Sequence, residues 1–348
     1  MNSRRAKTVF FLSVVMAWSL CAVQSFAQSS SDFERGLAEF RAGNYSSAAT
    51  LFASSEAASP GATDALLYRA KSLVHLQDFA GAEGALRGYL QSHRDSSDAL
   101  FMLGFVLNRE NRPAASLAAY TQAAALVQPT SDDLKIVGLD YILLDDYPDA
   151  IKWLEKAVEF DSRNADAWYY LGRAYYTRSR LIDARKAFVT ILNLDPYNAR
   201  AENSLGLVFE SDAQPAAAID AYRKSIAWSA QSPHPSEQSY VNLGGILLEQ
   251  GHTEEAILPL EKAVMLAPNN GFCRLKLGTS YLRAGRMEEA QKELEKATQL
   301  EPDNAIAHYQ LGRLYKAIHA KDRAQAEFDH AAELETQAAR SSTSPSGR

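Results

Sequence analysis

The sequence predicts an all-α fold, an α-solenoid of about nine helix pairs. Three features with a period of 34 residues predict it. Glycine recurs at one register position, alanine recurs 12 residues later, and a large apolar residue follows four residues after the alanine. A fixed period of this length is typical of helical repeat arrays, in which each unit is one pair of helices. Because the repeat covers most of the chain, little sequence is left for a separate globular domain.

The glycine position is the most regular of the three. It is filled by Gly36, Gly104, Gly138, Gly172, Gly206, Gly244, Gly278 and Gly312. Ala70 holds the same register between the first two glycines, and one step of 38 residues separates Gly206 from Gly244. We expect a small residue here because two helix backbones meet closely, despite a propensity cost of ~1 kcal/mol for glycine in a helix.

The alanine and large apolar positions complete the pattern. Alanine fills its position in every repeat except the third, which has Ser116. The large residues are Phe52, Leu86, Tyr120, Leu154, Phe188, Tyr222, Leu260, Leu294 and Phe328. One full unit reads Trp168-x2-Leu171-Gly172-x2-Tyr175, then Ala184-x3-Phe188, then Pro196. This unit resembles the tetratricopeptide repeat family at each of these positions. The resemblance implies a right-handed α-solenoid that binds proteins or peptides in a concave groove.

The predicted organisation follows the chain in five parts. Residues 1–27 are predicted to be a cleaved signal peptide, and residues 28–228 hold repeats one to six. Residues 229–236 form a linker with two prolines, which forbid a continuous helix. Residues 237–338 hold repeats seven to nine, and residues 339–348 form a polar tail predicted to be disordered.

The first 27 residues carry the features of an export signal. Arg4, Arg5 and Lys7 form a charged start, 9–23 is an apolar stretch, and Ala27 ends a small-x-small cleavage site. The apolar stretch is too short to span a bilayer, so no integral membrane span is expected. The signal predicts an exported protein, periplasmic or secreted. It leaves the general and the twin-arginine export routes both open.

Charge and composition exclude several classes of function. Removing Arg4, Arg5 and Lys7 changes the net charge from −6 to −9. An acidic chain does not favour nucleic acid, which requires a basic surface. The histidines show no metal-ligand spacing, and no phosphate-binding loop or nucleophile motif occurs. We therefore predict no enzymatic activity, no metal and no cofactor.

The predicted binding site is the concave face, which the first helices of the repeats line. The resemblance assigns the groove to Phe101, Phe105, Tyr169, Arg173, Tyr176, Phe272, Tyr309, Arg313 and Lys316. It also assigns Val241, Leu248 and Leu275 to the lining. The alternative is that these side chains are covered by the next repeat. Apolar and aromatic residues at groove positions favour binding of an extended or helical protein segment.

Two further points remain open from the sequence. Asp64, Asp98, Asp132 and Asp166 form a 34-residue ladder at the starts of four first helices. Carboxylates there complement the helix N-termini, and a site for a basic peptide is the alternative.

The leading functional hypothesis is a non-catalytic scaffold in the periplasm or envelope. A structural subunit of a larger envelope assembly or secretion machine, docking through its ends or convex face, is the second, and the oligomeric state is left open.

Overall fold

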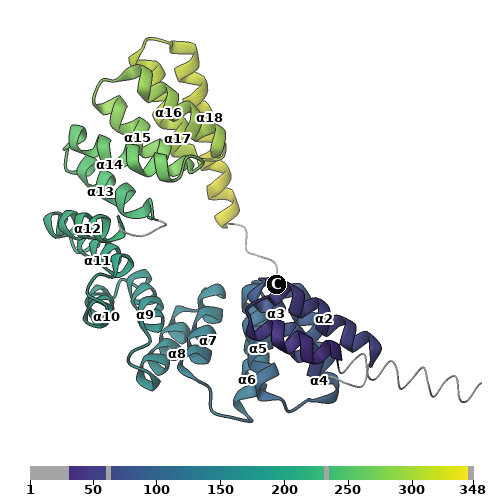
Figure 1. Cartoon of the computed structure of the whole chain (residues 1–348). Helices are drawn as coiled ribbons and strands as arrows, with labels where there is room; N and C mark the ends of the chain where they lie inside the picture. Colours follow the sequence, from purple (N-terminus) through teal and green to yellow (C-terminus); the bar gives the residue numbers. More distant parts are fainter. Residues whose placement is uncertain (1–30, 60–63, 231–234, 344–348) are drawn as a thin grey trace, which may run out of the picture. The chain divides into compact units, whose positions relative to one another are not determined.

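The chain is all-α. The computed structural model describes residues 31–59, 64–230 and 235–343, and every regular element within these ranges is a helix (Figure 1). This confirms the predicted all-α repeat solenoid. Contacts divide the chain into two compact units, Met1–Ala174 and Tyr175–Arg348, which are described separately. The predicted signal peptide lies outside the described residues.

In the first unit, the helices follow one another in antiparallel pairs. Residues 31–41 are helical. The later helices are α2 (Tyr45–Ala58), α3 (Asp64–His75), α4 (Phe79–Ser92), α5 (Ser97–Arg109), α6 (Pro113–Ala124), α7 (Ser131–Leu143), α8 (Tyr147–Phe160) and α9 (Ala165–Thr177). The boundary between the two units falls inside α9, after Ala174. The pairs α3–α4, α5–α6 and α7–α8 each pack together, and α5 also contacts α7 of the next pair. The first helix α5 therefore lies beside the first helix α7 of the next pair.

The second unit repeats this arrangement. Its helices are α10 (Leu181–Leu194), α11 (Ala199–Ser211), α12 (Pro215–Ser229), α13 (Gln238–Glu249), α14 (Thr253–Leu266), α15 (Gly271–Arg283), α16 (Met287–Leu300), α17 (Ala305–Ala317) and α18 (Lys321–Thr343). The first helices α11, α13, α15 and α17 contact one another in order. Helix α18 continues to Thr343, past the predicted end of the array at residue 338. The division predicted at 229–236 falls inside this unit and includes undescribed residues 231–234, so it stays a prediction.

The glycine position has the steric role that the sequence predicts. A Cβ placed on Gly104 would lie 2.6 Å from the Tyr120 ring, and one on Gly138 would lie 2.6 Å from Leu154. Tyr120 and Leu154 are the large apolar residues 16 positions later in the same repeats. Each first helix thus lies against the large side chain of its own second helix, at a distance that a methyl group does not allow.

The turn inside each pair uses one left-handed residue. Among the described residues, backbone φ is positive at Gly43, Gln77, Asn111, Asp145, Ser179, Ala213, Gly251, Gly285 and His319, one in each repeat. Only three of these are glycine, the residue that adopts this conformation without steric cost. Here the geometry of the helix pair overrides the local preference of the residue, because stacking on neighbouring repeats stabilises the whole turn.

One buried polar cluster joins repeats three and four. Asp140 of α7 is fully buried, and Ser116 of α6 is also fully buried. Asn108 Nδ2 donates to Asp140 Oδ1 at 2.8 Å, and Ser116 Oγ lies 2.5 Å from Asp140 Oδ2. Burial raises the pKa of Asp140 to about 6, while the hydrogen bonds from Asn108 and Ser116 oppose this rise. Ser116, the departure from the alanine pattern, is therefore matched to a carboxylate in the next repeat.

Candidate protein-binding surfaces

A groove lies over the first helices of the first unit. We call it the N-terminal groove, and its volume is about 710 Å³. Its lining consists of Lys71, Val74, Asp98, Phe101, Met102, Phe105, Tyr120, Val127, Gln128, Thr130, Asp132, Asp133, Lys135 and Ile136. These residues come from α3, α5, α6, α7 and the α6–α7 connection. The structure therefore brings together the predicted site residues Phe101 and Phe105.

The sequence of α5 explains why these two rings face the groove. Its other face buries Ala99, Leu103 and Val106 against the neighbouring helices. Phe101 and Phe105 are four residues apart, so they lie on one face of the helix, where both are half-buried. The Phe101 ring centroid is 5.8 Å from that of Tyr120, which fixes the ring from the side. Their partial exposure leaves apolar surface open to a ligand.

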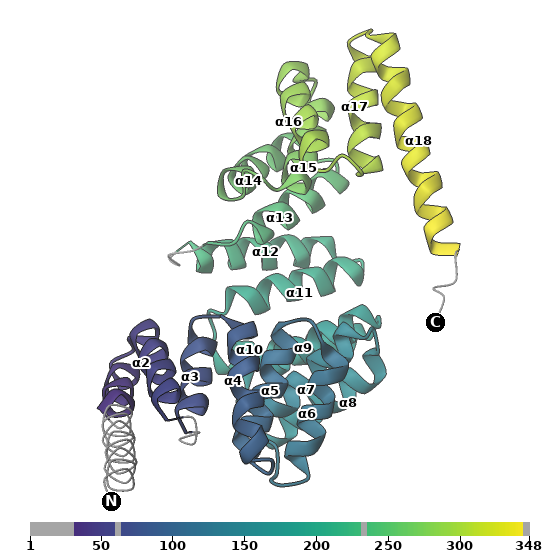
Figure 2. The same ribbon diagram turned by 90° about the vertical axis from the view of Figure 1, so that its right-hand side faces the viewer.

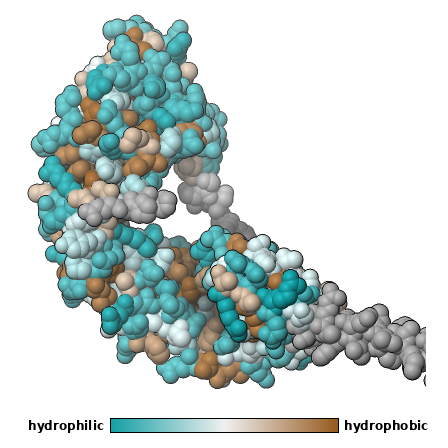
Figure 3. All heavy atoms as spheres, in the orientation of Figure 1, coloured by the Kyte–Doolittle hydropathy of each residue, from teal (hydrophilic) through white to brown (hydrophobic). Residues whose placement is uncertain are grey.

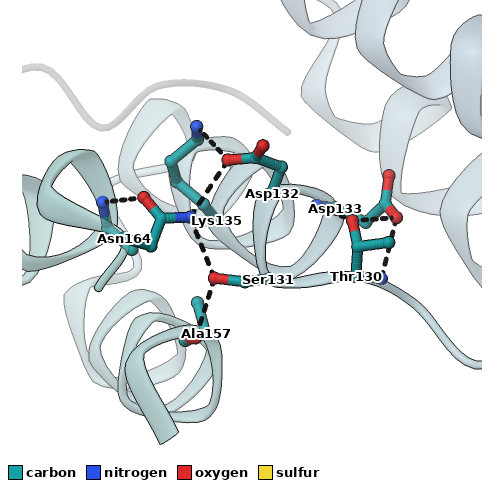
Figure 4. A network of polar contacts seen from close by, with 8 residues as sticks. Thr130, Ser131, Asp132, Asp133, Lys135, Ala157 and Asn164 are labelled. Carbon is teal, nitrogen blue, oxygen red and sulfur yellow. Dashed lines mark hydrogen bonds and ion pairs between the residues drawn. The ribbon is translucent and has the colours of Figure 1, made fainter. Parts of the chain in front are cut away.

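The start of α7 forms the acidic edge of the N-terminal groove. Thr130 and Asp133 form a reciprocal capping box, in which each side chain accepts a hydrogen bond from the other residue's backbone (Figure 4). Lys135 Nζ lies 2.6 Å from Asp132 Oδ1, and Asn164 Nδ2 donates to the same oxygen at 3.0 Å (Figure 4). The hydrogen bond from Lys135 and that from Asn164 lower the pKa of Asp132. Asp132 therefore remains ionised at neutral pH beside the apolar lining.

The aspartate ladder occupies helix N-termini. Asp64, Asp98, Asp132 and Asp166 each lie in the first turn of a first helix. Carboxylates there interact favourably with the helix dipole, in the structural role that the sequence suggests. Two of the four, Asp98 and Asp132, also line the N-terminal groove. Complementing a helix N-terminus and binding a basic peptide, the two roles that the sequence leaves open, are thus compatible at these two residues.

Three other predicted residues lie together in the second unit. Tyr309, Arg313 and Lys316 of α17 line a second groove with Ala317 and Phe328, and its volume is about 520 Å³. The ring centroids of Tyr309 and Phe328 are 5.6 Å apart. We call this the C-terminal groove. It differs from the N-terminal groove because, among the described residues, the charged side chains of its lining are the two cations Arg313 and Lys316.

The remaining predicted residues line neither of these grooves. The Arg173 guanidinium lies 5.9 Å from the centroid of the half-buried Tyr169 ring. In the second unit, the Tyr176 hydroxyl lies 2.9 Å from Ser211 Oγ. Phe272 is 44% exposed, with Lys276 Nζ 5.4 Å from its ring centroid. Their assignment to a binding site stays a prediction.

Part of the predicted lining is wrong. Val241, Leu248 and Leu275 are each less than 5% exposed, so they belong to the core of the second unit. Val241 packs with Cys273 of the next first helix, which covers it. By contrast, Met102 and Ile136 lie outside the predicted set and line the N-terminal groove. They occupy the same position in two successive repeats, directly after Phe101 and Lys135, and both are apolar. Apolar character at this position is the sequence signal that points to them.

Exposed apolar side chains also occur outside the grooves. Figure 3 shows apolar residues in brown at intervals among hydrophilic ones in teal. The most exposed large ones are Tyr197, Ile182, Leu258, Met265 and Ile306, all above 60%.

Within the described ranges, no group of His, Cys, Asp and Glu side chains is arranged to hold a metal ion. No helix among the described residues combines the length and apolarity needed to cross a bilayer.

Family models match more than half of the chain. Residues 138–179 and 278–318 match a model described as TPR repeat. Residues 33–97, 69–130 and 237–270 match models described as tetratricopeptide repeat. The chain belongs to the tetratricopeptide repeat family. Membership of this family supports a role in binding other proteins.

Two curated bacterial relatives and one solved structure are similar to this tetratricopeptide repeat chain. The type IV pilus assembly protein PilF of Pseudomonas aeruginosa is 33% identical over 98 residues, 28% of this chain and 37% of that protein. The cytochrome c-type biogenesis protein CycH of the same organism is 33% identical over 122 residues, 33% of this chain and 28% of that protein. The chain thus spans about a third of the length of each. A tetratricopeptide repeat protein from Parabacteroides merdae superposes with a TM-score of 0.58 at 16% identity, covering 72% of this chain and 98% of that one. That likeness concerns the fold alone.

Proposed function

We propose that the chain is a non-catalytic adaptor, exported to the cell envelope, that holds an extended or helical segment of a partner protein in its N-terminal groove. The observation that carries this proposal is the pair Phe101 and Phe105, half-buried side by side in a groove of about 710 Å³. Apolar rings that remain partly open on a folded domain favour an interaction. A groove of this volume accepts a few side chains of a bound segment rather than a whole domain.

The chemistry of the lining specifies the kind of segment. Phe101, Met102, Phe105 and Ile136 provide an apolar floor, and the methionine side chain adapts to different ligand shapes. Lys71 and Asp98 provide charges of opposite sign on the lining. We therefore propose that apolar side chains of the partner supply most of the affinity, and that polar groups set the register of the segment.

The proposed location rests on residues 1–27, which have the charged start, apolar stretch and cleavage site of an export signal. The similarity to a type IV pilus assembly protein supports an envelope role. An intact-mass measurement on protein isolated from the host tests export. We expect a chain that starts at Gln28, and a mass that includes residues 1–27 would contradict export.

Crosslinking in the envelope fraction, followed by mass spectrometry, tests the groove. Phe101→Ala combined with Phe105→Ala should lower the recovery of the bound partner by about tenfold or more, because each buried aromatic anchor contributes ~2 kcal/mol at an interface. The helical content by circular dichroism should stay the same, since neither ring is fully buried.

Phe160→Ala combined with Leu143→Ala is the matched control. Phe160 and Leu143 are 52% and 47% exposed in the same unit, and neither lines the N-terminal groove. Recovery of the partner should be unchanged. Equal recovery with the folded groove variant and with the control would move binding away from this groove.

A further inference from the structure

A cleft lies between two second helices of the first unit, and it shares no lining residue with the N-terminal groove. Its walls come from α4 and α6, and its volume is about 560 Å³. Its floor comes from α5, which packs against both walls and lies between them in the view of Figure 2. We call it the α4–α6 cleft.

Helix α5 turns different faces to the cleft and to the N-terminal groove. Leu100, Leu103 and Leu107 form the apolar floor of the cleft, and each is at most 6% exposed. Phe101 and Phe105 line the N-terminal groove instead. Because residues three or four apart share a face of a helix, the three leucines form one stripe and the two phenylalanines another. The two sites therefore lie on different sides of α5.

Small residues on α6 leave the cleft open. Ala115, Ala118 and Ala119 line it, and Ala118 is exposed. In the next second helix, α8, the corresponding residues are Asp149, Lys152 and Trp153. Trp153 is half-buried in its repeat. Helix α6 thus lacks the long side chains that α8 carries at these positions.

Two arginines of α4 stand at the rim of the cleft. Arg87 and Arg94 both line it, and both are exposed. Arg87 Nε donates to Glu83 Oε1 at 2.8 Å, and the same carboxylate pairs with Arg112 at 2.7 Å, so two arginines share one negative charge. None of the described residues that line the cleft is acidic. A cationic rim therefore stands above an apolar floor.

The spacing of the two arginines specifies a ligand. Seven residues separate Arg87 from Arg94, which is about two helix turns, or about 10 Å along α4. A second helix that runs along α4 has the same rise per residue. Carboxylates seven residues apart on that helix therefore meet both guanidinium groups, and arginine binds carboxylates strongly.

We infer that the α4–α6 cleft docks a helix of a partner protein that carries two Asp or Glu side chains seven residues apart and an apolar side chain between them. The apolar side chain enters the cleft over the leucines of α5, which exclude water from the contact. The two carboxylates lie opposite Arg87 and Arg94, so charge complementarity fixes the register of the helix. The N-terminal groove stays free, and the first unit can hold two protein segments at once.

Two synthetic helical peptides of about five turns and identical composition test the inference. Both carry leucine three and four residues after a chosen position i. The matched peptide has glutamate at i and i+7, and the shifted peptide has its glutamates at i+2 and i+9, on the other side of the helix. Fluorescence anisotropy with the full chain measures both affinities at low salt. The matched peptide should bind at least about tenfold more tightly, and the difference should shrink at high salt. Equal affinities at low salt would overturn the inference.

Filling the cleft identifies the site. Ala118→Trp places a large side chain in it and should weaken binding of the matched peptide about tenfold or more. Because Ala118 is exposed, the helical content by circular dichroism should stay the same. Ala124→Trp is the matched control, since Ala124 is also exposed on α6 but lines neither the cleft nor the N-terminal groove. Equal binding by the folded Ala118→Trp protein and by the control would place the peptide elsewhere and overturn the inference.

Charge reversal tests the rim independently. Arg94→Glu should remove the preference for the matched peptide. Arg163→Glu makes the same change in net charge at an exposed residue of the same unit outside the cleft, and it should leave the preference intact. If Arg94→Glu does not fold, Arg94→Gln should reduce the preference severalfold. A preference that persists in the folded Arg94 variant would contradict the inference.

A second copy of this chain is the other possible occupant, and sedimentation velocity tests it. The unmodified protein should show no self-association that depends on the cleft. Self-association that Ala118→Trp abolishes and Ala124→Trp does not would assign the cleft to a homodimer and overturn the partner-helix proposal.

Discussion

Ser116 Oγ lies 2.5 Å from Asp140 Oδ2 and 2.8 Å from the Gly104 carbonyl oxygen. A hydroxyl has a single proton, so Ser116 donates to one of these acceptors at a time. When Asp140 is ionised, Ser116 donates to the carboxylate. When Asp140 is protonated, its carboxyl group donates to Ser116, which then donates to Gly104. The cluster can therefore satisfy either protonation state of a fully buried acid.

Ser116→Ala should destabilise the protein although it restores the alanine of the repeat pattern. It leaves one oxygen of the buried Asp140 without its donor, which costs ~1–3 kcal/mol at neutral pH. Chemical denaturation of the variant measures this loss. The same substitution in an Asp140→Ala background should cost much less, and equal losses in both backgrounds would show that the two residues are not coupled.

Asp140 should make stability fall as pH rises. Its pKa is raised by burial from 3.8 to about 6, so the folded state holds a proton that the unfolded state releases between these values. The stabilisation from this group is present below pH 3.8 and is lost as pH rises through about 6. Asp140→Asn resembles the protonated form at every pH. This variant should therefore lack the part of the pH dependence of stability that comes from Asp140. Denaturation midpoints of both proteins across this range test it, and parallel curves would contradict the assignment.

Gly104→Ala should destabilise the protein, because the new Cβ would lie 2.6 Å from the Tyr120 ring. Forcing a methyl group into a packed interface costs ~1–3 kcal/mol. Gly84→Ala is the matched control, since this glycine also lies in a helix but has no atom within 4 Å of a new Cβ. The control should gain ~0.5–1 kcal/mol from helix propensity. Thermal unfolding distinguishes the two, and a stabilised Gly104→Ala protein would contradict the packing argument.

Ala213→Gly should stabilise the protein. Ala213 has a φ of 53°, in the left-handed region where a Cβ costs ~1 kcal/mol or more. Glycine relieves this strain, and part of the gain is offset by the greater freedom of glycine in the unfolded chain. A modest rise in the free energy of unfolding is expected, while Gly285→Ala at the equivalent turn should have the opposite effect. A fall in stability for Ala213→Gly would show that the turn is not strained.

The repeat itself was predictable from the sequence because it follows local steric rules. A 34-residue period of glycine, alanine and a large apolar residue describes one contact within one helix pair, such as Gly104 against Tyr120. The structure confirms this contact at Gly36, Gly104, Gly138, Gly206, Gly244, Gly278 and Gly312. Phe101 and Phe105 lie on one face of a first helix, as their spacing of four residues predicts.

Only the tertiary structure decided which of those faces remain open. Val241 and Leu275 share a register with Tyr309, but the first two are covered by the following first helix and the third is not. Exposure at these positions depends on which helix stacks on the repeat. The sequence of one repeat does not determine that helix. The left-handed turns at Gln77 and Ala213 have the same origin, because the packing of two helices imposes a backbone conformation that neither residue prefers. The sequence alone thus determined the repeating unit and its internal contacts, whereas the stacking of units determined the surfaces available for binding.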